Sequence, residues 1–107
     1  MSEPVFMLNV LWFKEHGGRE KYAEYGAAVA PLLDAVGGQA GEMYKPEQAL
    51  IGDWNPDAIF VVKYPSMEAF ERMAGSPEYA EIMHLREEAL DNSLLVRCSE
   101  FDWANGA

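Results

Sequence analysis

Two stretches of the chain are almost continuously apolar, and they are the strongest structural signal in the sequence. Val5–Phe13 contains one polar residue, Asn9, and Ala58–Tyr64 contains one charged residue, Lys63. A strand with one face in water alternates apolar and polar residues, whereas both alternating sets are apolar here. We therefore predict two central strands that are buried on both faces.

Residues 19–36 carry apolar side chains at the spacing of an amphipathic helix. The apolar stripe consists of Tyr22, Tyr25, Val29, Leu32, Leu33 and Val36. Gly37 and Gly38 follow it directly, and glycine commonly follows the last turn of a helix. Pro31 lies inside the stripe, where it removes a backbone donor and crowds the preceding turn. We therefore predict one helix that is kinked near Pro31.

Two further helices are predicted from the residues that would begin them. Ser66 is a good N-cap for a short helix from Met67 to Ala74. Ser76 is an N-cap for a second helix, in which Pro77 takes the favoured first position. We expect this second helix to extend to about Asp91.

The remaining stretches are less regular. We predict short strands at Met43–Tyr44 and Gln48–Ile51, a loop at Gly52–Asp57 because of its turn residues, and a last strand at Leu94–Trp103. The resulting order, β-α-β-β-α-β, predicts a ferredoxin-like α+β fold with a four-stranded antiparallel sheet. The 107 residues suffice for a single such domain, with a core from about residue 5 to residue 103.

The second face of this sheet needs a cover. In a ferredoxin-like monomer the helices cover one face, and the other face meets water and is expected to be polar. The central strands are apolar on both faces, and soluble monomers rarely expose an apolar patch of several hundred square ångströms. A second copy of the chain, packed sheet to sheet about a two-fold axis, would provide the cover. The alternative is that residues 39–57 fold over this face.

Charge and composition limit the classes of molecule that the protein is expected to bind. The formal net charge of −10, from 8 basic and 18 acidic residues, argues against nucleic acid and anionic membranes. No apolar stretch approaches the roughly 18 residues that span a membrane. The one cysteine, Cys98, and the absence of a secretory signal at the N-terminus predict a cytoplasmic protein. The sequence contains no cluster of metal-ligating residues at suitable spacing, so we expect no metal site, and we also expect no cofactor.

Several short motifs, in this order, resemble one family. They are Tyr22-Ala23-Glu24-Tyr25, Pro31-Leu32-Leu33, Gly52-Asp53-Trp54, Ser76-Pro77-Glu78-Tyr79 and Arg86. The chain resembles the domain of unknown function 1330 family, within the dimeric α/β-barrel group, from about Val5 to Phe101. The resemblance implies a ferredoxin-like fold and a barrel-forming homodimer. The wider group includes cofactor-independent monooxygenases, isomerases and small-ligand binders, so the resemblance selects no activity.

Arg86 is the first candidate for a functional residue. The apolar face of its predicted helix consists of Tyr79, Ile82, Met83, Ala89 and Leu90. At helical spacing Arg86 falls at the centre of this face, and a buried arginine needs a partner. Arg86 could line a pocket and bind a carboxylate or another anion. Alternatively it could form a structural ion pair with Asp53 or Asp57.

Asn9 is the second candidate, because it is the polar residue of a buried strand. A buried amide needs hydrogen-bond partners. Asn9 could face a ligand cavity and orient a carbonyl group or an oxyanion. Alternatively its amide could bind nearby backbone or a partner subunit.

Aromatic residues could supply the walls of such a cavity. Trp12, Trp54, Tyr22, Tyr25 and Tyr79 combine apolar rings with polar groups that can orient a ligand. Tyr22 and Tyr25 follow soon after the strand that carries Trp12, which makes a shared pocket plausible. The alternative is that these rings serve core and dimer packing.

Three functions remain open at this point. The first is a small-molecule site used for cofactor-independent chemistry on a compact anionic or aromatic metabolite. The second is a binding or sensing module with the same pocket and no turnover. The third is a purely structural dimer. In the first two, Arg86 would anchor the anion while Asn9 and a tyrosine would polarise it.

Overall fold

The two apolar stretches form the middle of a four-stranded antiparallel sheet. β1 (Val5–Phe13) pairs with β3 (Ala58–Tyr64) on one side and with β4 (Leu90–Cys98) on the other, and β2 (Gln39–Ala40) pairs with β3 at the sheet edge. The computed structural model describes residues 3–105, and both predicted central strands have the predicted bounds. The element order confirms the ferredoxin-like prediction.

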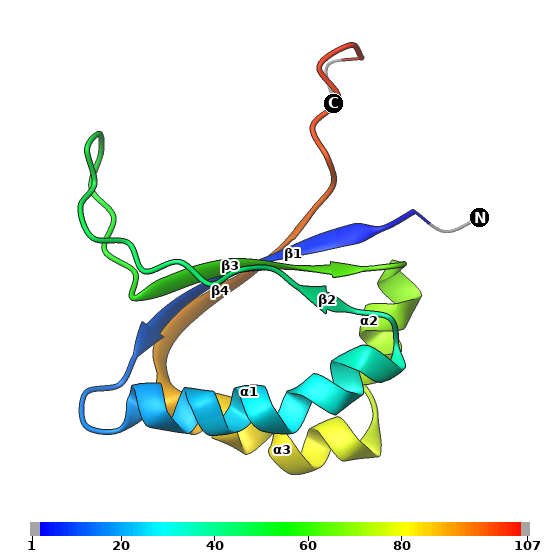
Figure 1. Ribbon diagram of the computed structural model, residues 1–107, viewed down its shortest axis with the longest axis horizontal. Coiled ribbons are helices and arrows are strands. Elements are labelled where there is room, and N and C mark those ends of the chain that lie inside the picture. The colour runs from blue at the N-terminus through cyan, green and yellow to red at the C-terminus, as the bar shows by residue number, and fades with distance from the viewer. Residues whose placement is uncertain (1–2, 106–107) are drawn as a thin grey trace.

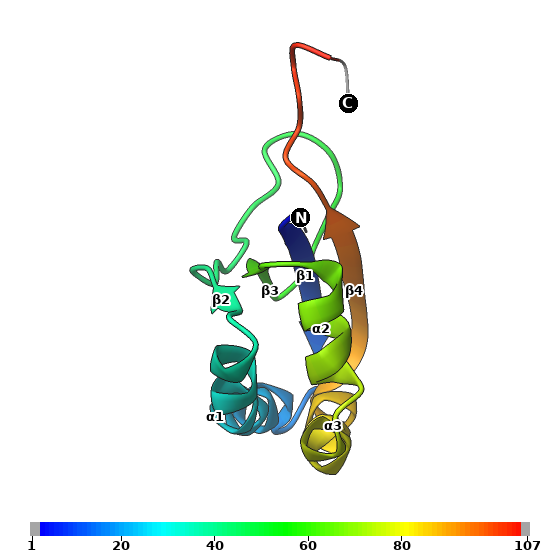
Figure 2. The ribbon, with the colours of Figure 1, turned by 90° about the vertical axis from the view of Figure 1, so that its right-hand side faces the viewer.

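Helices form a second layer on one face of the sheet, as Figures 1 and 2 show. α1 (Gly18–Ala35) and α3 (Pro77–Ala89) lie side by side along the sheet, and α2 (Met67–Ala74) links the two layers at one end. α1 continues through Pro31 as a single helix. None of the described helices is both long and apolar enough to cross a membrane.

The predicted serine caps begin both later helices. Ser66 Oγ accepts a hydrogen bond from the backbone N–H of Ala69 at 3.1 Å. Ser76 Oγ accepts one from the backbone N–H of Tyr79 at 3.1 Å, and Pro77 takes the first helical position. The caps satisfy backbone donors that have no partner within the helix.

The core between the two layers consists of two adjoining clusters. One is built on Leu11, Tyr22, Tyr25, Ala58, Ala89 and Leu90. The other is built on Val5, Met7, Val62, Tyr64 and Met73. In both clusters, alternate residues of β1 and β3 face the helices, as the period of a strand requires.

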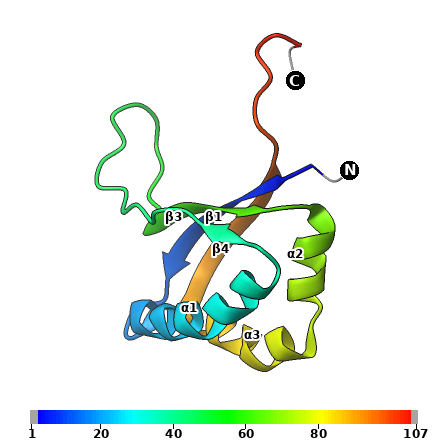
Figure 3. The same ribbon diagram turned by 45° about the vertical axis from the view of Figure 1, so that its right-hand side comes forward.

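The segment between β2 and β3 differs from the prediction. The edge strand is Gln39–Ala40, which pairs with Lys63 and Val62, while Tyr44 makes an isolated bridge to Ile59. Residues 48–51 form no strand, and Ile51 is 98% exposed. A strand needs an edge with free backbone groups, and β3 begins only at residue 58. Residues 48–51 lie in a loop beyond the end of that edge (Figure 3).

The last strand also differs from the prediction. α3 ends at Ala89, and Leu90 is already extended, so the helix enters β4 without a loop. The strand ends at Cys98 rather than Trp103, because Cys98 pairs with Phe6 near the start of β1. Beyond that pair, β1 has only one residue, Val5, left for pairing. Residues 99–105 form no strand, and residues 106–107 lie outside the described residues.

The sheet face opposite the helices is apolar and largely open. Val61, Leu94 and Val96 on this face are 39%, 43% and 42% exposed. The β2–β3 loop and the C-terminal segment rise beside it, away from the helices (Figures 1 and 3). The loop covers only one end of this face, where Trp12 Nε1 donates a hydrogen bond to Asn55 Oδ1 at 3.2 Å. The predicted alternative cover, residues 39–57, is therefore partial.

Candidate functional site

A cavity of about 310 Å³ lies between the sheet and the helices, and we call it the inner cavity. Its floor comes from β1, β3 and β4, and its walls come from all three helices. The residues that line it include Met7, Asn9, Tyr22, Tyr25, Gly26, Val29, Met43, Phe60, Val62, Met73, Tyr79, Arg86 and Leu95. Ligand pockets typically start at about 300 Å³, so the inner cavity suits a compact molecule.

Arg86 carries the only full charge at neutral pH among the described residues that line this cavity. Its Nη2 atom is buried and has no hydrogen-bond partner within residues 3–105. No carboxylate in that range lies within 4.0 Å of its guanidinium group. Asp57, one of the two predicted partners, instead accepts a hydrogen bond from the backbone N–H of Phe13 at 2.8 Å. The described chain therefore leaves this guanidinium without a counter-ion.

Arg86 is near, but not at, the centre of the inward face of α3. Leu85 packs against the core and Ala89 is fully buried, whereas Met83 is 45% exposed. The inward face is thus rotated from the predicted Met83 side toward Leu85. Helical spacing fixes the angles between side chains, but it does not decide which side of a weakly amphipathic helix the sheet will cover.

Three tyrosines line the inner cavity together with Arg86. Tyr22 and Tyr25 come from α1, and Tyr79 comes from the first turn of α3. The hydroxyl oxygens of Tyr25 and Tyr79 are 2.9 Å apart and form a hydrogen bond in which either can be the donor. The rings of Tyr22 and Tyr25 are tilted against each other, with centroids 5.3 Å apart. The cavity therefore offers phenol groups beside a cation.

Burial keeps the phenols of Tyr22 and Tyr25 neutral over a wide pH range. Loss of hydration raises the pKa of Tyr22 to about 12, although the nearby positive charge of Arg86 opposes the rise. Burial and the hydrogen bond with Tyr79 also raise the pKa of Tyr25. A neutral phenol can donate a hydrogen bond to an anion, whereas a phenolate would repel it. The electrostatics of the inner cavity thus favour a negatively charged occupant.

Asn9 lies on the cavity floor and is 7% exposed. Its side-chain Nδ2 donates a hydrogen bond to the backbone oxygen of Met7 at 3.1 Å. The predicted bond to nearby backbone is therefore present, and it fixes the direction of the amide group. The same residue lines the cavity, so the two predicted roles of Asn9 are compatible.

The structure brings together five of the predicted residues at the inner cavity, namely Asn9, Tyr22, Tyr25, Tyr79 and Arg86. It does not bring Trp12, Trp54 or Asp53 to the inner cavity. Trp12 alternates with Leu11 along β1 and therefore lies on the other sheet face, where its ring packs edge-on against Trp54 at 6.5 Å. The predicted pocket shared by Trp12 and Tyr25 is not formed, because neighbouring strand positions point to opposite faces.

Other lining residues carried no signal in the sequence. Gly26, Met43 and Leu95 line the cavity. Their residue types are common in cores and loops, so only their placement identifies them. The described chain holds no group of three His, Cys, Asp or Glu side chains suited to a metal ion.

Comparison with known proteins identifies related sequences and structures. A family model described as "Domain of unknown function (DUF1330)" matches residues 11–97. A search of curated proteins finds no match. Among solved structures, the RPA0582 protein of unknown function from Rhodopseudomonas palustris is 32% identical, with a TM-score of 0.86. That match covers 95% of this chain and 85% of the other.

More distant structures share the fold. One is a dimeric ferredoxin-like protein of unknown function from Jannaschia sp. CCS1, with 14% identity, a TM-score of 0.69, and coverage of 91% of this chain and 99% of that one. Another is a Dabb family protein with a ferredoxin-like fold from Mesorhizobium loti, with 13% identity, a TM-score of 0.66, and coverage of 92% and 98%. These likenesses confirm the ferredoxin-like α+β fold.

Proposed function

The chain belongs to the DUF1330 family, and from that premise we propose that its inner cavity binds a compact organic anion, such as a small aromatic or branched carboxylate. One observation carries the proposal: the buried Nη2 of Arg86 has no partner in a cavity whose described lining contains no acidic residue. A buried cation without a counter-ion costs folding free energy, and a ligand carboxylate would remove that cost.

The other polar groups support the same class of ligand. The phenol hydroxyls of Tyr22, Tyr25 and Tyr79 would add hydrogen bonds to the anion. The amide of Asn9, held by the backbone of Met7, would orient a second polar atom. Apolar side chains such as Val29 complete the wall and would contact the body of the ligand. The net charge of −10 on the chain repels anions at long range, so affinity for the ligand must come from these local contacts.

Benzoate and its uncharged analogue benzamide test this proposal. We expect benzoate to raise the melting temperature of the wild-type protein, because it binds the folded state, and we expect benzamide at equal concentration to have little effect. Arg86→Gln should abolish the benzoate shift. The exposed Arg72 on α2 offers a matched control, since Arg72→Gln removes the same charge outside the cavity.

The melting temperatures without ligand give a fold control. Because Arg86 has no described ion-pair partner and its buried charge is costly, Arg86→Gln should be at least as stable as the wild type. A benzoate shift that Arg86→Gln leaves intact would exclude Arg86 as the anchor. The absence of binding by benzoate, phenylacetate and cyclohexanecarboxylate alike would contradict the anion site itself.

Cofactor-independent catalysis is a second candidate function. The cation and the neutral phenols also suit a negative charge that develops on a carbonyl oxygen during a reaction. The hydrogen-bonded hydroxyls of Tyr25 and Tyr79 favour this role, because such a pair can donate to an oxyanion. Catalysis would be supported if the protein turned over a ligand found by the binding screen, and if Tyr79→Phe abolished this turnover while ligand binding persisted. Binding without turnover would support a sensing role.

A homodimer is also part of the proposed function. The open apolar face on β1, β3 and β4 supports it, and the Jannaschia protein with this fold is described as dimeric. Packing two such faces together about a two-fold axis would bury the exposed valines and leucines of both subunits. The inner cavity lies on the other side of the sheet, so each subunit would keep its own site.

A further inference from the structure

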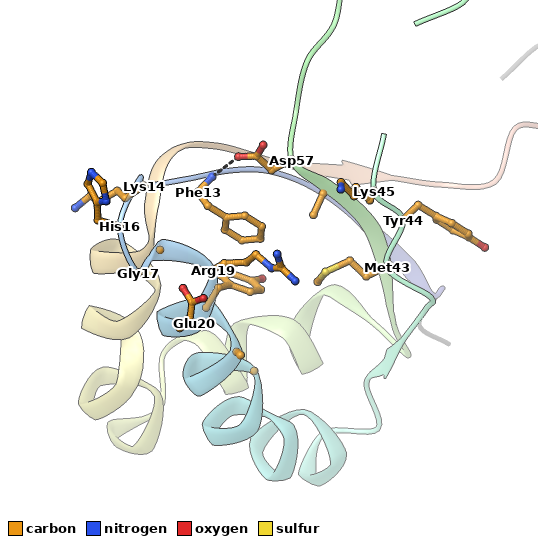
Figure 4. A pocket seen from close by; sticks show the side chains of 15 residues that line it. Phe13, Lys14, His16, Gly17, Arg19, Glu20, Met43, Tyr44, Lys45 and Asp57 are labelled. Carbon is orange, nitrogen blue, oxygen red and sulfur yellow. Dashed lines mark hydrogen bonds between the residues drawn. The ribbon is translucent and has the colours of Figure 1, made fainter. Parts of the chain in front are cut away.

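A second hollow adjoins the inner cavity, and we call it the outer groove. It has a volume of about 880 Å³ and lies between the end of β1, the first turns of α1 and residues 43–45 (Figure 4). Tyr22, Gly26 and Met43 line both the outer groove and the inner cavity. These shared residues make the two hollows neighbours, and a ligand in one can extend toward the other.

The outer groove concentrates unpaired positive charge. Lys14, Arg19 and Lys45 line it, and the chain has only 8 basic residues. None of these three makes an ion pair within residues 3–105, in a chain with 18 acidic residues. In Figure 4 the side chain of Arg19 extends into the groove toward Met43, whereas that of Lys14 extends outward.

Two acidic residues, Glu20 and Asp57, also line the outer groove. The carboxylate of Asp57 is held by the backbone N–H of Phe13 at 2.8 Å, as the dashed line in Figure 4 shows. The carboxylate of Asp57 therefore binds the backbone and makes no ion pair with Lys14, Arg19 or Lys45 within residues 3–105. The groove therefore retains cations that can meet an anion from solvent.

Gly26 stands where the two hollows meet. It lies in the interior of α1, where glycine is less favourable than alanine. A Cβ atom added at Gly26 would meet no atom within 4 Å, so close packing does not require glycine there. The space that a side chain would enter belongs to the lining of both hollows. The absence of a side chain therefore leaves space free at the position that the two hollows share.

We propose that the ligand has two anionic groups separated by an apolar body, with one group at Arg86 in the inner cavity and the other at Arg19 and Lys45 in the outer groove. This inference rests on the proposed anion site at Arg86 and adds a second contact to it. The apolar body would pass beside Gly26 and Tyr22. The outer anionic group is a carboxylate or a phosphate, and both would bind these cations.

Matched ligand series test the second contact. Straight-chain dicarboxylates from glutarate to sebacate are compared by calorimetric or NMR titration with the monocarboxylates of equal length. At one or more lengths we expect the dicarboxylate to bind about fivefold tighter, the gain typical of one partly exposed ion pair. Added salt should reduce this gain, because the outer groove is open to solvent. Phosphonocarboxylates of the same lengths distinguish a phosphate-like outer group from a carboxylate.

Variants then locate the two contacts. Arg19→Gln with Lys45→Gln should remove the dicarboxylate advantage and leave monocarboxylate binding unchanged. Gly26→Leu should also remove the advantage, because its side chain would fill the connection. Ala27→Leu, on the same helix at an exposed position that lines neither hollow, is the matched control.

The outcomes separate this inference from the proposed function. If dicarboxylates never bind tighter than matched monocarboxylates, the two-anion ligand is excluded while the site at Arg86 stands. The two-anion ligand is also excluded if the tighter binding of dicarboxylates persists in the double variant Arg19→Gln/Lys45→Gln and in Gly26→Leu. If no carboxylate of either series binds, the proposed function and this inference both fail.

Discussion

The hydroxyl groups of Tyr25 and Tyr79 meet at 2.9 Å across the inner cavity and tie the middle of α1 to the first turn of α3. Their rings also contact edge to face, with centroids 6.3 Å apart. The two residues are 54 positions apart in the chain. This contact holds together the two helices that carry most of the polar groups of the candidate site.

Removing one of these hydroxyls should destabilise the fold. Tyr79→Phe leaves the phenol of Tyr25 without its partner, and we expect a loss of about 1 kcal/mol in the free energy of unfolding. Urea denaturation measures it. Tyr44→Phe is the control, because Tyr44 is exposed, and it should change little. The double variant Tyr25→Phe/Tyr79→Phe should cost less than the sum of the single variants. Additive losses would show that the hydroxyls do not interact.

Stability should fall at high pH. Burial raises the pKa of Tyr22 and Tyr64 from 10.0 to about 12. The unfolded chain releases these protons near pH 10, while the folded protein holds them to about pH 12. Their contribution is therefore fully present below pH 10 and is lost between pH 10 and 12. Chemical denaturation across this range checks it, and Tyr22→Phe or Tyr64→Phe should each flatten the decline. A slope unchanged in both variants would refute this origin.

Two glycines of α1 should respond oppositely to alanine. Gly26→Ala should stabilise the protein by about 1 kcal/mol, because alanine is the better helix former and its Cβ meets open space. Gly18→Ala should destabilise it, because a Cβ there would lie 2.6 Å from the backbone oxygen of Ala89. Thermal melts of the two variants test the pair. Destabilisation by Gly26→Ala would show that the position is packed rather than open.

The open sheet face should control assembly. Val96 lies on this face opposite Leu8 of β1, and Val96→Glu would place a charge in the proposed dimer interface. We expect light scattering to show a dimer for the wild type and a monomer for Val96→Glu. Met83→Glu changes an equally exposed residue on α3, in the opposite layer, and should leave the dimer intact. A wild-type monomer at micromolar concentration would contradict the proposed interface.

Features that depend on neighbouring residues are predictable from the amino-acid sequence of this protein. In β1 and β3 both alternating sets of residues are apolar, and this pattern predicts the two strands at their observed bounds. The prediction succeeds because the two-residue period of a strand is visible in neighbouring residues. Ser66 and Ser76 predicted the starts of two helices, because an N-cap acts within one turn. Asn9 and Arg86 stood out because each interrupts an apolar pattern, and both line the inner cavity.

Features that depend on distances between remote segments could not be predicted without the fold. The start of β4 at Leu90 follows from its register with Phe13, and pairing registers cannot be read from one strand alone. The sequence also allows Asp57 as an ion-pair partner of Arg86, but the fold places its carboxylate at the backbone N–H of Phe13. The unpaired guanidinium and the opening beside Gly26 arise where segments distant in the chain meet, because packing between elements, rather than local pattern, sets which side chains remain unpartnered.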